Sequence, residues 1–160
     1  MESLNTTFKD KNGRVWDLSL NFLTVERVCK ETGVDLLDYE QQHTLAAELA
    51  IDDVKLAKTA AAILAPNLGD AGIQPEAFAD AIADGEILAE IYEAIAGAVV
   101  NFTRARRRAT VAGLFSKANM AIGKAAAVAE KHLESGAIDR QIEKDLEKFA
   151  ERLSGTPPLC

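Results

Sequence analysis

The chain has 160 residues, a formal net charge of −7 and a hydrophobic share of 48%. This length allows one domain with its own core, without disulfides or metals as staples. The polar N-terminus and the lack of an apolar run near the roughly 20 residues that span a bilayer argue against a secreted or membrane protein.

The first predicted element is a β-hairpin over residues 7–22, around the turn signal Asn12-Gly13. Both turn residues tolerate the positive φ angles that tight hairpins need. After the turn, large apolar residues alternate with polar ones, which predicts a strand whose apolar face is formed by Trp16, Leu18, Leu20 and Phe22. A lone two-stranded ribbon is marginal in water. We therefore expect this face to lie against helices or against another chain.

A short helix is predicted next, because the apolar period changes. Thr24 is a candidate N-cap, and Val25, Val28 and Cys29 would lie on the apolar side. Gly33 fits the left-handed conformation that ends many helices. The following VDLLDYE segment reads as a short connector.

In the middle of the chain, the sequence predicts two helices joined by a loop. Asp52-Asp53 is a candidate cap for a helix that ends before Pro66. PNLGDAGIQP, with two prolines and two glycines, is the strongest loop signal. Pro75 then opens the next helix at its first turn.

Three further helices are predicted towards the C-terminus. One spans about 86–102, one follows the arginine-rich stretch and ends near 135, and a last amphipathic helix is capped by Asp139. The fold class is therefore mainly α (α+β), with an N-terminal β-hairpin packed on a bundle of about five to seven helices.

Alanine marks two sub-regions, because residues 1–45 contain none and the rest contains 28. We interpret 1–153 as a single domain, with the hairpin and short helix in 1–45 and an alanine-rich helical body in 46–153. Residues 154–160 contain two prolines and predict a flexible tail. Nothing pairs Cys29 with Cys160, which indicates a reducing, cytoplasmic setting.

No arrangement of catalytic or metal-binding residues stands out. The two histidines and two cysteines match no metal-ligand spacing, and residues 118–125 lack the first glycine and the hydroxyl residue of a phosphate loop. The acidic residues follow capping and exposed-face patterns rather than a converging pair. We therefore expect no enzymatic activity, no cofactor and no metal.

The one concentrated charge feature is formed by Arg104, Arg106, Arg107 and Arg108. Charge is uneven along the chain, because residues 21–100 carry 15 acidic and 4 basic residues, whereas 101–160 carry 7 and 11. Such asymmetry favours oppositely charged partners or self-association. The arginines could bind a protein partner, hold nucleic-acid phosphates, or pair within the chain with acidic helices and the C-terminal end of helix 86–102.

The apolar face of helix 86–102 is the second candidate partner-binding surface, and it is formed by Ile91, Ile95, Val99 and Phe102. Gly97, Gly113 and Gly123 lie inside predicted helices, where each costs up to about 1 kcal/mol relative to alanine. Close approach of a neighbouring helix or chain would compensate that cost, and ordinary internal packing is the alternative.

Residues 8–38, FKDKNGRVWDLSLNFLTVERVCKETGVDLLD, resemble the start of small proteins of tailed bacteriophages and prophages. The shared pattern, F-x-D-x-x-G-R-x-W-x-L, an apolar residue and Asn, then R-V and G-V-D-L-L-D, includes as structural signature Gly13, Trp16, Leu18, Leu20, Arg27, Gly33, Asp35, Leu36 and Leu37. The group is associated with tail assembly chaperones. The resemblance thus implies a chaperone that binds the tape-measure protein while the tail tube polymerises.

Three functions stay open at this stage. The first is a non-enzymatic tail assembly chaperone in the bacterial host cytoplasm, binding a helical tape-measure-like client and self-associating. The second is a structural virion or head–tail component. The third is a small nucleic-acid-binding regulator that uses Arg104 to Arg108.

Overall fold

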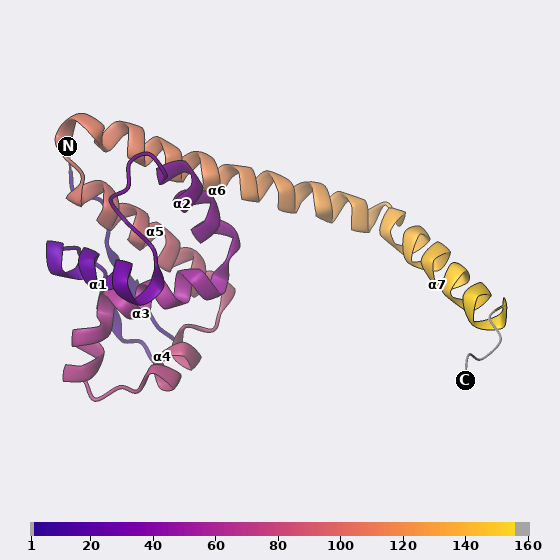
Figure 1. Cartoon of the computed structure of the whole chain (residues 1–160), viewed down its shortest axis with the longest axis horizontal. Helices are drawn as coiled ribbons and strands as arrows, with labels where there is room; N and C mark the ends of the chain where they lie inside the picture. Colours follow the sequence, from indigo (N-terminus) through magenta and orange to yellow (C-terminus); the bar gives the residue numbers. More distant parts are fainter. Residues whose placement is uncertain (1, 156–160) are drawn as a thin grey trace. The chain divides into compact units, whose positions relative to one another are not determined.

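The computed structural model describes residues 2–155. The described residues form β1 (Thr7–Lys9), β2 (Val15–Asp17), α1 (Phe22–Thr32), α2 (Gln42–Ile51), α3 (Asp53–Asp70), α4 (Pro75–Ile82), α5 (Gly85–Phe102), α6 (Ala105–Glu134) and α7 (Ala137–Gly155). The predicted fold class is confirmed: the chain is mainly helical, and an antiparallel two-stranded hairpin packs on the helices (Figure 1).

The chain divides into two compact units, one up to residue 120 and one from residue 121 onward. The division falls within α6, and the single domain predicted over 1–153 stays a prediction. In the first unit, α2 packs against α3 and α5. Of the predicted tail, residues 154 and 155 end α7, and residues 156–160 lie outside the described residues.

The hairpin is organised by the buried carboxylate of Asp10. This carboxylate accepts hydrogen bonds from the backbone N–H groups of Asn12 and Arg14 and from Trp16 Nε1, over 2.9 to 3.0 Å. The predicted turn lies where expected, but only Gly13 adopts a positive φ, of 79°. Because all these bonds converge on one carboxylate, Asp10, Asn12, Arg14 and Trp16 form one structural unit within the D-x-x-G-R-x-W stretch.

Asn21 ends the extended segment and starts α1. Its Oδ1 accepts a hydrogen bond from the backbone N–H of Thr24 at 2.8 Å, so the cap is Asn21 and not Thr24 as predicted. β2 already ends at Asp17, and Phe22 is the first residue of α1, with 77% of its surface exposed. The prediction of one strand face through Phe22 is therefore wrong, because asparagine is a strong N-cap. Cys29, predicted on the apolar side of this helix, is exposed.

Other helix ends follow local signals. Asp52 and Asp84 cap α3 and α5 through hydrogen bonds from backbone N–H groups of the first turn, and Pro75 begins α4. Gly136, with φ 67°, separates α6 from α7. Asp139 lies in the first turn of α7 rather than at its cap. α6 begins at Ala105, so it includes most of the arginine run.

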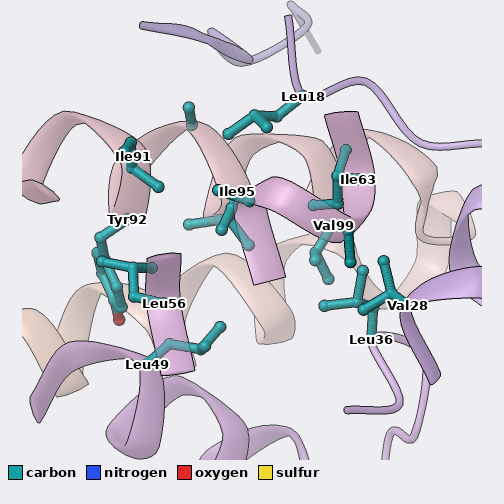
Figure 2. Packing of buried hydrophobic residues seen from close by; sticks show 14 of the residues in the cluster. Leu18, Val28, Leu36, Leu49, Leu56, Ile63, Ile91, Tyr92, Ile95 and Val99 are labelled. Carbon is teal, nitrogen blue, oxygen red and sulfur yellow. The ribbon is translucent and has the colours of Figure 1, made fainter. Parts of the chain in front are cut away.

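Helix α5 is the centre of the first unit, because every residue from 91 to 100 except Glu93 is buried. It packs against β1, α2 and α3. Figure 2 shows its side chains among those of the surrounding elements, including Leu18, Val28, Leu36, Leu49, Leu56 and Ile63. A helix that is apolar on all sides belongs in a core.

Helix α3 continues through Pro66 to Asp70, although the sequence predicts that it ends before the proline. Proline lacks the N–H that would bond to the carbonyl four residues earlier, which is that of Ala62. Arg27 takes this place: its Nε donates to the Ala62 oxygen at 2.9 Å and its Nη2 to the Ile63 oxygen at 3.0 Å. The guanidinium on α1 thus satisfies the backbone that the proline disrupts.

We expect Arg27→Met to lower the free energy of unfolding by about 1–3 kcal/mol, because it leaves backbone carbonyls without their donor. The same substitution in a Pro66→Ala background should cost less, since the new N–H can donate to the Ala62 oxygen. Urea denaturation of the four proteins of this cycle measures both costs. Equal costs in the two backgrounds would contradict the compensation.

The segment before β1 lies directly on α5. The Asn101 side chain accepts a hydrogen bond from the Leu4 N–H and donates one to the Leu4 oxygen, each over 2.8 Å. At Gly97, an added Cβ would overlap the backbone oxygen of Asn5, whereas at Gly113 it would meet open space. Close backbone approach therefore explains Gly97 but not Gly113.

Gly97→Ala should destabilise the protein by about 1–3 kcal/mol, because the added methyl group overpacks this contact. The matched substitution Gly113→Ala should stabilise it by up to about 1 kcal/mol, because only helix propensity changes. Thermal and urea unfolding compare the two variants with the unaltered chain. Stabilisation by both substitutions would show that the N-terminal segment does not rest on α5.

Candidate partner-binding site

A pocket of about 290 Å³ opens where α5 ends and α6 begins. Aromatic, aliphatic and cationic side chains line it, and these are Phe22, Leu37, Tyr39, Phe102, Arg104, Arg106 and Arg107. We call this the arginine–aromatic pocket. It gathers residues from the N-terminus of α1, the connector after α1 and the junction of α5 and α6, which lie far apart in the sequence.

Two phenylalanines give the pocket its apolar wall. The rings of Phe22 and Phe102 lie 5.0 Å apart between centroids, in an edge-to-face arrangement. Such pairs are favourable beyond the area they bury. Asn21 places Phe22 at the first position of α1, where it remains mostly in solvent. A large aromatic side chain in this position offers contact area to a partner.

Three arginines make the pocket cationic. The Arg107 guanidinium lies over the Tyr39 ring, 4.4 Å from its centroid, and Arg104 and Arg106 are exposed beside it. The first turn of α6 contains no acidic residue. Positive side chains at a helix N-terminus add to the positive end of the helix dipole instead of compensating it. The site therefore favours an anionic group.

Arg108 has a different role, although it belongs to the same run. Its Nε donates to the Thr103 oxygen at 2.9 Å and its Nη2 to the Asn101 oxygen at 3.3 Å. These carbonyls lie at the C-terminal end of α5, where helix carbonyls lack intrahelical donors. The local alternative considered for the arginine run thus holds for this one residue.

The structure separates the residues that the sequence groups as partner-binding. Ile91, Ile95 and Val99 are completely buried in the core, so their side chains are not at the surface. Phe102 and three of the four arginines come together in the pocket. Phe22 and Tyr39 are pocket residues that the sequence reasoning missed. For Phe22, the strong capping residue before it was the available signal.

The predicted signature residues mainly hold the first unit together. Besides Gly13 and Arg27, whose roles are given above, the buried or partly buried ones are Trp16, Leu18, Leu20 and Leu36. Gly33 ends α1 with φ 73°, and Asp35 accepts a hydrogen bond from the Leu37 N–H at 3.0 Å. Leu37 differs from the others, because it lines the pocket.

A second cavity, of about 350 Å³, has Tyr92 and Phe115 in its wall. The Tyr92 hydroxyl lies 3.0 Å from the Phe115 oxygen and 3.3 Å from the Ala46 oxygen. Burial, with a smaller effect of the Glu93 charge, raises the pKa of Tyr92 to about 12. The phenol therefore stays neutral at physiological pH and links α2, α5 and α6 as a hydrogen-bond donor.

Residues 2–155 contain no group of three or more His, Cys, Asp or Glu side chains placed to hold a metal ion. None of the helices in this range combines the length and apolar character of a membrane span. Neither a protein-family model, nor a curated protein, nor a solved structure matches the chain. The arginine–aromatic pocket is therefore interpreted from the chemistry of its own lining.

Proposed function

We propose that this chain is a non-enzymatic binding protein that holds another polypeptide, and that it acts as a tail assembly chaperone of a tailed bacteriophage. The arginine–aromatic pocket supports the binding role, because it presents an exposed Phe22 beside three cationic side chains. The resemblance of residues 8–38 supports the phage role. In this proposal the chaperone works in the cytoplasm of the bacterial host and self-associates.

The pocket lining fits a client helix with an apolar side chain flanked by carboxylates. Apolar or aromatic groups would pack against the edge-to-face pair of Phe22 and Phe102. Carboxylates would pair with Arg104 and Arg106, because guanidinium groups bind carboxylates through two parallel hydrogen bonds. A tape-measure-like protein, long and helical with apolar stripes, offers such segments.

The rest of the charge distribution favours a polypeptide over a nucleic acid. Residues 21–100 carry 15 acidic and 4 basic residues, and a surface of this sign repels a polyanion. An acidic stretch of a helix is short enough to meet the three pocket arginines alone. The cationic pocket is therefore matched to a local anionic group.

A second candidate function is single-stranded nucleic-acid binding. In the sequence, Phe102 is the one aromatic residue close to the arginines. In the structure, Phe22 and Tyr39 join Phe102 in the pocket. Aromatic rings beside arginines are the usual platform for stacked bases. This function requires affinity for an oligonucleotide that falls steeply with salt, through counterion release.

Pocket variants should lose the client. We expect Phe22→Ser and Arg106→Glu each to weaken binding by about tenfold or more, because each removes a central pocket contact. The test is co-expression with the tape-measure-like product of the same gene neighbourhood, followed by co-purification and measurement of its soluble fraction. Val15→Ser and Lys117→Glu, which alter exposed residues outside the pocket, are the matched controls.

Three outcomes would count against this proposal. A client that stays insoluble with the unaltered chain would remove the chaperone role. Equal co-purification with pocket and control variants would remove the pocket from it. Retention of the chain in purified phage particles would favour the structural virion component instead.

A further inference from the structure

The last helix, α7, carries a continuous apolar stripe that nothing in its own unit covers. None of the described residues of α7 is buried. The stripe consists of large side chains with exposed fractions between 36% and 68%, namely Ile138, Ile142, Leu146, Phe149 and Leu153. These residues recur at intervals of four and three, so they share one face of the helix.

A helix with such a stripe is expected to pack its apolar face against another element or chain. Isolated helices of this length are marginal in water, and most helical stability in proteins comes from packing of the apolar face. Contiguous exposed apolar patches of this kind mark interaction sites. The spacing 4, 3, 4 from Ile142 to Leu153 is that of the a and d positions of a coiled coil. The stripe is therefore built to pair with another helix.

The charged residues on either side of the stripe favour one orientation of two paired copies over the other. One flank carries Asp139 and Glu143, and the other carries Asp145, Lys148 and Arg152. In a parallel pair of two copies, the unlike flanks meet, and Asp145 comes beside Ala150 of the other copy, so it gains no ion pair. In an antiparallel pair, each flank meets its own counterpart. Asp145 then falls between the Lys148 and Arg152 positions of the other copy.

We propose that α7 pairs with α7 of a second copy of this chain, in antiparallel orientation, with Leu146 of each copy packing against Phe149 of the other. Ile142 then meets Leu153 at each end of the seam, so all four apolar layers are filled. Attraction between Asp145 and Arg152 of the other copy, at the positions next to the seam, favours this orientation, whereas the two Lys148 side chains lie farther from the seam beside the two-fold axis. The antiparallel arrangement also aligns the two helix dipoles favourably.

This inference extends the proposed self-association by naming its surface. It does not depend on the client, because every residue that lines the arginine–aromatic pocket precedes residue 121. A chain that dimerises but binds no client would leave this inference intact and remove the proposed function. A chain that binds the client as a monomer would do the opposite.

The first test is the molar mass of the full chain across a concentration series, by light scattering and sedimentation. The unaltered chain should reach the mass of a dimer. Leu146→Glu and Phe149→Glu should each raise the dimer dissociation constant by at least about tenfold, because a carboxylate would enter the apolar seam. Lys144→Glu, on the opposite face of α7, should leave the dissociation constant unchanged. Circular dichroism controls for loss of the helix.

A charge exchange tests the flank without altering the seam. Asp145→Arg should weaken the dimer, and so should Lys148→Asp combined with Arg152→Asp. The three substitutions together should restore the unaltered dissociation constant, because the attraction is re-formed with its signs exchanged. A chain that is monomeric at all concentrations, or a triple variant no tighter than its parents, would overturn the pairing.

Orientation is tested with spin labels in a background without Cys29 and Cys160. In the antiparallel pair, labels at residue 147 lie near the two-fold axis, whereas labels at residue 140 are displaced along the helix by about 22 Å, from the helical rise of about 1.5 Å per residue. Pulsed electron resonance should therefore give a short distance at 147 and a much longer one at 140. Similar short distances at both positions would show a parallel pair and contradict the proposal.

Discussion

The burial of α5 on all sides is the constraint on which the first unit depends. Because nine of its residues from 91 to 100 are buried, every direction around the helix must be covered by another element. α2 and α3 supply part of this cover, and β1 and the segment that rests on Gly97 supply more. The hairpin therefore covers part of the core. Hydrogen bonds to the Asp10 carboxylate fix the shape of its turn. Its role is structural cover for one helix.

The same constraint bears on the proposed binding site. The centre of α5 is buried, so the proposed partner contacts fall where its burial ends, at Phe102 and the following arginines. Asn21 and the connector after α1 bring Phe22, Leu37 and Tyr39 to that place. The second unit has no buried residue in α7 and offers the opposite kind of surface, a long stripe instead of a pocket. The two proposed contacts therefore depend on different interactions. The arginine–aromatic pocket combines charge with aromatic packing, whereas the stripe of α7 relies on apolar packing.

Local signals predicted the fold well, and long-range contacts account for what they missed. Caps, glycine stops and apolar periods located the hairpin and the helices, because each depends on neighbours in sequence. The continuation of α3 through Pro66 was not predictable in this way, because its compensation comes from Arg27, which lies 35 residues before the Ala62 carbonyl that it binds. Likewise, the period of Ile91, Ile95 and Val99 predicts an apolar face but not whether a partner or the chain itself covers it. Three of the four arginines of the predicted run line the pocket, but only three-dimensional contacts separate Arg108 from the others.

Native-state hydrogen exchange of the full chain tests the central role of α5 most directly. The account predicts that the amides of residues 91–100 are the slowest in the chain and exchange only with global unfolding. Their protection should be independent of protein concentration. Fast exchange of these amides under native conditions would show that α5 opens locally, and its apolar face would then be available to partners after all.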